Sequence, residues 1–191
     1  MPKPERWDGV DSFVLGRWRE VTDLNRAFHR TMRRMRRRLK NASEALAPRL
    51  KGDGFEIEPD VRDATLLVYR PAWCGANGEP MVSLGVAEIF PVGYYGVSEE
   101  KAYIGVYIAA EDEAQVARFT EKLRGAVESL ADWSSTPDAQ WPLWRYIDGW
   151  DDSRRAQLAA ADQDELRKAL FEQVEAVLKL ERAVSAAFTQ Q

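Results

Sequence analysis

The fold is decided by residues 65–109, which read TLLVYRPAWCGANGEPMVSLGVAEIFPVGYYGVSEEKAYIGVYIA. Three apolar runs in this stretch, Thr65–Arg70, Met81–Phe90 and Ala102–Ala109, have the length and composition of β-strands. Segments rich in glycine and proline separate them, and the alternating residues Phe55–Glu58 form a further strand ahead of them. Because short turns and no helix join these strands, we expect a four-stranded antiparallel β-meander.

Helical patterns flank the predicted sheet on both sides. From about Asp11 to Ala47, apolar residues recur in steps of three and four, which is typical of one face of a long helix. This apolar stripe consists of Val21, Leu24, Phe28, Met32, Met35, Leu39, Ala42 and Leu46. After the sheet, similar spacing predicts helices over about 111–130 and 152–161, and a last helix that begins at Asp162 and continues to Phe188.

Together these elements predict an α+β fold in which helices pack on the sheet, with long helices at both ends of the chain. Residues 1–50 form the long basic N-terminal helix, and residues 51–150 form the sheet, one helix and a tryptophan-rich loop. Residues 151–191 form acidic C-terminal helices that pack on the rest. A length of 191 residues agrees with one structural domain overall.

Charge is divided unevenly along the chain. Residues 1–51 contain 14 Lys and Arg against 6 Asp and Glu, whereas residues 52–191 contain 13 against 25. The cations concentrate in residues 26–40, the basic segment, which contains no acidic residue. Its members are Arg26, Arg30, Arg33, Arg34, Arg36, Arg37, Arg38 and Lys40. Such a concentration of positive charge requires acidic partners, either within the chain or outside it.

Three interpretations of the basic segment are open. In the first, one helix face binds the phosphates of DNA or RNA through Arg26, Arg30, Arg33, Arg34, Arg37, Arg38 and Lys40. In the second, the same face binds an acidic protein. In the third, the first and last helices pair antiparallel, and acidic residues of the last helix neutralise the segment. Those acidic residues are Asp164, Glu165, Glu172, Glu175 and Glu181.

A second candidate surface is aromatic. The two-residue period of a strand places Tyr103, Gly105 and Tyr107 on one face of the sheet, which Tyr69 is expected to join. Such side chains stack on bases or form a protein interface, unless a helix of the same domain covers them. Further candidates for this face are Trp73, Tyr94 and Tyr95. The four tryptophans between residues 133 and 150 are more typical of a loop anchored on the core.

The sequence gives little support for catalysis. His29 is the only histidine, and Cys74, the only cysteine, has no such base beside it in the sequence. These counts exclude histidine-based triads, most zinc sites and an internal disulfide, and no glycine-rich phosphate loop is present. We therefore predict no catalytic residue, no metal ligand and no cofactor. A divalent-metal nuclease is a remaining alternative, for which the pieces are Asp63, Glu88 and Glu99–Lys101.

The chain shows no sign of membrane association. No uncharged apolar run approaches the roughly 20 residues of a membrane helix, and the first residues lack the apolar core of a signal peptide. A single cysteine gives no indication of an oxidising compartment. We therefore expect a cytoplasmic protein with no membrane partner.

Three segments carry a resemblance to known proteins: Val82–Glu88, Tyr103–Val106 and Trp141–Tyr146. With them, the block from Phe55 to about Trp150 resembles a domain of uncharacterised bacterial proteins that are linked to phage-defence or restriction loci. Some of these proteins are attached to nucleases of the PD-(D/E)XK superfamily. The nuclease signature is not matched at any position, so the resemblance implies an accessory or recognition domain and no catalytic residue.

The function expected from these observations is that of a non-enzymatic binding module. The basic segment, with the aromatic face as a second surface, would engage nucleic acid or an acidic protein. The alternative is an interaction protein whose near-heptad helices form a homodimer or dock onto a partner.

Overall fold

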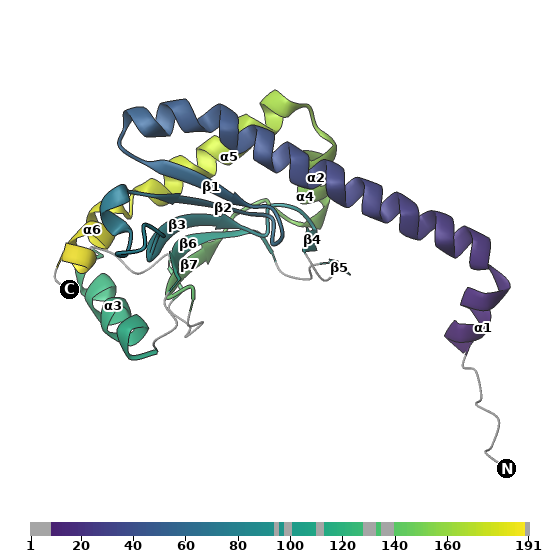
Figure 1. Cartoon of the computed structure of the whole chain (residues 1–191), viewed down its shortest axis with the longest axis horizontal. Coiled ribbons are helices and arrows are strands. Elements are labelled where there is room, and N and C mark those ends of the chain that lie inside the picture. The colour runs from purple at the N-terminus through teal and green to yellow at the C-terminus, as the bar shows by residue number, and fades with distance from the viewer. Residues whose placement is uncertain are drawn as a thin grey trace, which may run out of the picture. The chain divides into compact units, whose positions relative to one another are not determined.

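The structure is a computed structural model that describes residues 9–93, 96–97, 101–109, 113–127, 133–134 and 140–189 (Figure 1). The chain divides into two units, Met1–Met35 and Arg36–Gln191. The boundary falls within one long helix, α2 (Trp18–Gly52), so each unit contains part of the basic segment.

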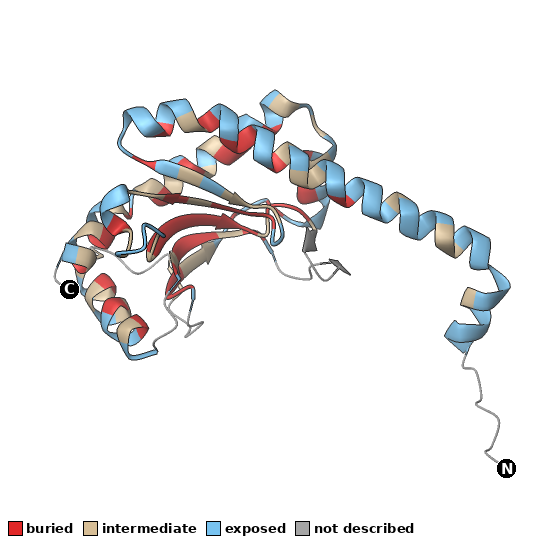
Figure 2. Cartoon of the chain, viewed as in Figure 1, coloured by how far each residue is buried: buried red, intermediate tan, exposed pale blue. Residues whose placement is uncertain are grey.

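The first unit consists of α1 (Gly9–Gly16) and residues 18–35 of α2. No residue of α1 is buried. The large apolar side chains exposed in this unit are Val10, Phe13, Leu15, Trp18, Leu24 and Phe28 (Figure 2). Leu24 and Phe28 belong to the predicted apolar stripe, so this part of the stripe is exposed. The many Arg, Met and Leu residues of α2 are strong helix formers, which favours a helix here without extensive packing.

The second unit is built on a five-stranded antiparallel sheet. Its strands, in order across the sheet, are β1 (Glu56–Asp60), β2 (Thr65–Tyr69), β3 (Val82–Ala87), β6 (Tyr103–Ile108) and β7 (Leu143–Tyr146). Pro59 is tolerated in β1 because this strand lies at the edge of the sheet. A short 3₁₀ helix, Pro71–Trp73, follows β2, and a small ribbon of β4 (Val92–Gly93) and β5 (Gly96–Val97) follows β3.

The predicted α+β fold with an antiparallel sheet is confirmed, although the sheet has five strands rather than four. The additional strand is β7, which sequence analysis assigns to the tryptophan-rich loop. It has only four residues and follows Pro142, so it lacks the long apolar run of the other strands. Gly105 permits the pairing, because a Cβ at this position would lie 2.4 Å from the carbonyl oxygen of Leu143.

Four helices complete the described part of the second unit: α3 (Glu113–Ala126), α4 (Asp152–Ala160), α5 (Gln163–Leu178) and α6 (Glu181–Thr189). The Asp162 carboxylate caps α5 by accepting a hydrogen bond from the Glu165 backbone N–H at 2.7 Å. This contact confirms the predicted start of the last helix.

The prediction that this last helix continues to Phe188 is wrong. The chain turns at Lys179 and Leu180, and α6 begins at the next residue. At the turn, the Leu180 N–H bonds to the carbonyl of Val177, three residues back instead of four, and this tighter bond ends α5.

Helices cover one face of the sheet. α5 packs on β3 and β6, and residues 36–52 of α2 lie alongside α5 (Figure 1). The side chains between these layers are at most 4% exposed and include Leu39, Leu46, Leu84, Val86, Ile104, Val106, Leu170 and Val174. Because side chains alternate along a strand, Gly85 of β3 and Tyr103 and Tyr107 of β6 point to the opposite face.

Residues 36–52 of α2 run parallel to α5, and not antiparallel as in the third interpretation of the basic segment. Arg38 of α2 donates a hydrogen bond of 3.1 Å to the carbonyl of Asp162, at the start of α5. Arg49, eleven residues later on α2, pairs with Glu175 near the end of α5 at 3.0 Å. The sheet and α4 lie between the two helices in the sequence and return the chain to the Arg38 end of the pair, so no short turn imposes an antiparallel arrangement.

Candidate functional site

The part of the basic segment in the first unit is exposed. Arg26, Arg30, Arg33 and Arg34 all have exposed side chains. Arg26 lies 3.5 Å from Asp23, but the two side chains are 69% and 64% exposed, so this ion pair is weak. The other three arginines form no ion pair with any residue that the structure describes.

In the second unit, only some side chains of the basic segment have hydrogen-bond or ion-pair partners. Arg38 is half-buried and donates to the carbonyls of Ala161 and Asp162, and Arg36 is half-buried as well. Arg37 and Lys40 are exposed, and Lys40 lies 3.9 Å from Glu44 on the next helical turn. Most of the predicted binding residues are therefore accessible in their own unit.

Four of the five acidic residues named for the C-terminal helices have partners outside the basic segment. Glu175 pairs with Arg49, Glu165 with Arg154, Glu181 with Arg70 and Asp164 with Arg167. Within the second unit, none of these carboxylates pairs with Arg36, Arg37, Arg38 or Lys40. For this part of the segment the expected neutralisation is not found, because the parallel arrangement places the start of α5, and not its acidic face, beside Arg38.

The resulting surface is a row of like charges on one helix. Arg30, Arg33 and Arg37 are spaced by three and four residues, so they share one face of α2. Like charges at this spacing repel and destabilise the helix slightly. A polyanion that brings several phosphates to this face would remove the repulsion and release its own counterions.

The predicted aromatic face exists, with a different composition from the one expected. Tyr103 and Tyr107 are half-buried, and Trp141 lies against both, with ring centroids 4.9 Å and 5.3 Å away. Trp141 occupies this place because Gly85 has no side chain; a Cβ there would lie 2.4 Å from the Trp141 ring. In the described part of the chain, a tryptophan and not a helix covers this face.

Acidic residues surround the tyrosines. Tyr69 donates a hydrogen bond to Glu56 at 3.3 Å. Burial, then the charge of Glu56 and its hydrogen bond, and then Glu58, raise the pKa of Tyr69 to about 12. Burial, followed by the negative charges of Asp60 and Asp63, also raises the pKa of Tyr107. The sheet face is thus aromatic and electronegative.

Two other aromatic predictions have different outcomes. Trp73 does not join the tyrosines: it is 2% exposed, packs on Phe55 and donates a hydrogen bond to Ser185. Tyr94 and Tyr95 lie outside the described residues.

The pieces of the alternative nuclease site are only partly brought together. Asp63 and Glu88 line the same pocket, whereas Glu99 and Glu100 lie outside the described residues. Lys101 lies over the ring of Tyr146, 5.7 Å from its centroid. The described residues contain no group of three or more His, Cys, Asp or Glu side chains arranged to hold a metal ion.

His29 lies edge-on to Phe28, and burial raises the pKa of the half-buried Cys74 thiol.

Sequence analysis does not identify Arg155, which is completely buried. It donates to the Phe90 carbonyl at 2.7 Å and pairs with Glu88 at 3.4 Å and Asp152 at 3.1 Å. Glu88 has a φ of 54°, an unfavourable backbone conformation for a residue with a side chain. Arg155 therefore fixes Glu88 beside the sheet, although no sequence pattern distinguishes it from Arg154, the other arginine of α4.

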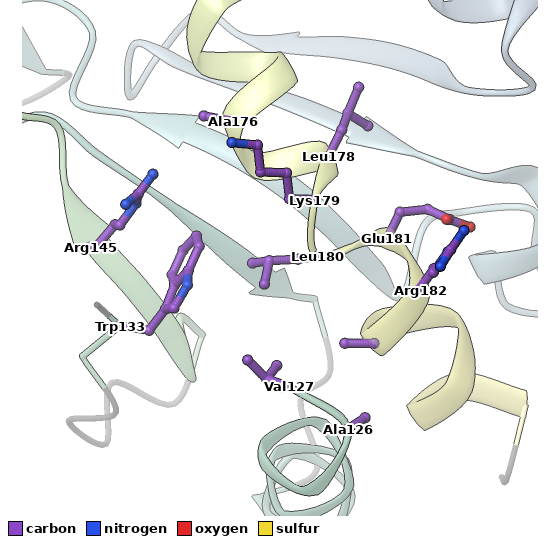
Figure 3. Close-up of a pocket in the computed structure, with 11 residues that line it drawn as sticks. Ala126, Val127, Trp133, Arg145, Ala176, Leu178, Lys179, Leu180, Glu181 and Arg182 are labelled. Atoms are coloured by element: carbon purple, nitrogen blue, oxygen red, sulfur yellow. The ribbon is translucent and has the colours of Figure 1, made fainter. Parts of the chain in front are cut away.

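A larger pocket, of about 620 Å³, lies where α3, β7 and the α5–α6 turn meet (Figure 3). Arg145, Lys179 and Arg182 contribute positive charge, and the Arg145 guanidinium lies 5.0 Å from the centre of the Trp133 ring. Residues 128–132 connect two parts of its lining and lie outside the described residues.

No helix among the described residues is long and apolar enough to cross a membrane. No family model matches the chain, and neither the curated proteins nor the solved structures contain a match to it.

Proposed function

We propose that the protein is a non-enzymatic binding module that engages DNA or RNA through the basic segment of α2. One observation carries this proposal: Arg30, Arg33, Arg34 and Arg37 are exposed and form no ion pair with a described residue. Arginine binds phosphate oxygens in a bidentate manner and is always charged, so such a row is suited to a phosphate backbone. The contacts would be largely independent of base sequence.

The aromatic face is not included in this proposal. Asp60 and Asp63 line the same pocket as Tyr103 and Tyr107, and their negative charge would repel a phosphate backbone. Nucleic acid would therefore bind the helix and not the sheet.

The test is fluorescence anisotropy with labelled double-stranded DNA, single-stranded DNA and RNA at two salt concentrations. Affinity should fall steeply between about 50 and 200 mM salt. In the variant Arg30→Gln/Arg33→Gln/Arg37→Gln, the slope of log affinity against log salt should decrease by about one for each phosphate that the variant no longer neutralises.

A matched control removes three charges outside the segment: Arg118→Gln/Arg167→Gln/Lys168→Gln, all of them exposed. It should bind like the unaltered protein. No detectable binding at low salt, or an equal decrease in affinity in the two triple variants, would refute the proposal. Stronger binding to polyglutamate than to nucleic acid would instead assign the segment to an acidic protein partner.

Self-association is a second candidate function, which the exposure of Leu24 (70%) and Phe28 (37%) favours. These residues continue the near-heptad spacing that pairs helices in coiled coils. Sedimentation at tens of micromolar should then show a dimer that Leu24→Glu converts to a monomer. A monomer without any substitution would exclude this function.

The proposed setting is cytoplasmic, where nucleic acid is accessible. The resemblance of residues 55–150 to a domain from phage-defence and restriction loci supports an accessory role near nucleic acid. Degradation of DNA by the purified protein with Mg²⁺ would contradict the non-enzymatic proposal and favour the nuclease alternative.

A further inference from the structure

A pocket of about 310 Å³ opens on the sheet face opposite α5, entirely within the second unit. It is lined by Asp60, Asp63, Thr65, Leu67, Glu88, Tyr103, Tyr107, Gln140 and Trp141. These residues come from the β1–β2 hairpin, the end of β3, strand β6 and the segment before β7. Neither the proposed nucleic-acid contact nor the fold itself requires this combination of aromatic and acidic side chains.

The aromatic walls of the pocket are fixed in position. Trp141 is 7% exposed and is seated over Gly85, where any larger residue would clash with its ring. Tyr103 meets Trp141 edge to face at 85°, and Tyr107 meets it at 54°. The three rings therefore pack on one another and form one rigid aromatic wall of the pocket.

The carboxylates are also held by the fold. Asp60 accepts a hydrogen bond from the Arg62 backbone N–H at 2.9 Å, in the turn that leads to Asp63. Glu88 is fixed by its pairing with the buried Arg155. None of the described residues that line the pocket is cationic, and the raised pKa of Tyr107, caused by burial and then by Asp60 and Asp63, reflects the negative potential.

This combination selects among ligand classes. An anion would be repelled by the carboxylates of Asp60 and Asp63, whereas the charge of Glu88 is balanced by the buried Arg155. A small metal ion needs oxygen ligands that converge to about 2.0–2.6 Å, and no described group of residues is arranged in that way. A cation whose charge is spread over several atoms fits both features, because ring faces attract it and carboxylates need not converge on one point.

We propose that this pocket binds a small organic cation, a guanidinium or an alkylammonium group, between the rings of Tyr103, Tyr107 and Trp141 and the carboxylates of Asp60, Asp63 and Glu88. Ser83 lies opposite Tyr107 on β3 and projects from the same face. Its hydroxyl is buried and has no hydrogen-bond partner among the described residues. This site is independent of the basic segment.

The proposal can be tested by NMR of the full chain labelled with ¹⁵N. The indole N–H resonance of Trp141, assigned with Trp141→Phe, is followed during titration with choline, with arginine methyl ester and with 3,3-dimethyl-1-butanol. The last compound has the shape of choline without its charge. A saturable shift with at least one cation and none with the neutral compound is expected. The two cations distinguish an ammonium from a guanidinium ligand.

Three substitutions assign the binding to the pocket. Asp63→Asn and Tyr107→Leu should each weaken it about 2- to 30-fold, the range expected for the removal of one charge or one aromatic ring. Tyr107→Phe keeps the ring and should retain affinity. Asp148→Asn, an exposed acidic position in the turn after β7, is the matched control and should have no effect.

Equal shifts with the neutral compound, or no shift with either cation, would overturn the proposal. Unchanged affinity in Asp63→Asn would do the same. Because Asp63 is exposed, its substitution should not perturb folding, so it decides the question even if Tyr107→Leu is unstable.

Discussion

In residues 36–52 of α2 the side chains of the apolar stripe are buried, whereas in residues 18–35 Leu24 and Phe28 are exposed, Val21 and Met35 are half-buried, and Met32 is buried. Leu39 and Leu46 are 0% and 4% exposed, but Leu24 is 70% exposed. The cations differ in the same way: Arg49 pairs with Glu175, whereas Arg33 has no ion pair with a described residue. The spacing of a helix thus determines which residues share a face, and the rest of the fold determines whether that face has a partner.

The largest difference in unfolding free energy is expected between Arg155, which has buried partners, and Arg33, which has no ion pair with a described residue. Arg155→Ala removes the donor to the Phe90 carbonyl and the cation beside Glu88, and should lower the free energy of unfolding by about 3–5 kcal/mol. Arg33→Ala should change it by less than about 0.5 kcal/mol. Urea unfolding followed by circular dichroism measures both. A decrease below about 1 kcal/mol in Arg155→Ala would show that its buried contacts are not stabilising.

Two leucines of the apolar stripe test whether its burial differs between the two parts of α2. Leu46→Ala should cost about 2–5 kcal/mol, because it leaves a cavity between α2 and its neighbours in the second unit. Leu24→Ala should cost less than about 0.5 kcal/mol in the monomer. A similar cost at both positions would mean that a partner, such as a second copy of the chain, covers Leu24 in solution. Repeating the measurement at several protein concentrations identifies that case.

A smaller change in unfolding free energy is expected when the exposed residues Arg49 and Arg34 are substituted. The Arg49 guanidinium lies 3.8 Å from the centre of the Phe171 ring and pairs with Glu175, so Arg49→Gln should cost about 0.5–1 kcal/mol. Arg34→Gln, the matched change in the other half, should be neutral or slightly stabilising because it relieves repulsion between like charges. Raising the salt concentration should reduce the difference between the two variants. A decrease in stability in Arg34→Gln equal to that in Arg49→Gln would contradict the comparison.

The sequence predicts the strands and helices well where the pattern is long. The three apolar runs of residues 65–109 each contain one strand of the sheet, and the stripe from Val21 to Leu46 lies within one helix. The sequence does not predict β7, a strand of four residues that follows a proline. This strand pairs closely with β6 because Gly105 has no side chain. Such a close approach depends on tertiary structure and leaves no periodic signal.

The candidate sites differ in the same respect. The basic segment is continuous in sequence, so its residues can be identified directly, although their exposure cannot. The cation pocket combines Asp60, Glu88 and Trp141, which come from three distant segments. Tyr103 and Tyr107 are recognisable in advance from the two-residue period of β6. Sequence analysis names Asp63 and Glu88 only as pieces of a nuclease site, and their position beside the tyrosines becomes apparent only in the folded chain.

The last prediction concerns the titration of Tyr69, which affects stability only at alkaline pH. Tyr69 lies close to the negative charges of Glu56 and Glu58 on the sheet. Its pKa is raised from 10.0 to about 12 by burial and then by Glu56. Between these two pH values the unfolded chain loses the phenolic proton and the folded chain keeps it, so stability falls as the pH rises.

Tyr69→Phe should remove this contribution, and Glu56→Gln should lower the Tyr69 pKa. Tyrosinate absorbance reports the pKa, and urea unfolding at several alkaline pH values reports the slope. An unchanged slope in Tyr69→Phe would show that this residue is not the source, whereas an unchanged Tyr69 pKa in Glu56→Gln would leave burial as its main cause.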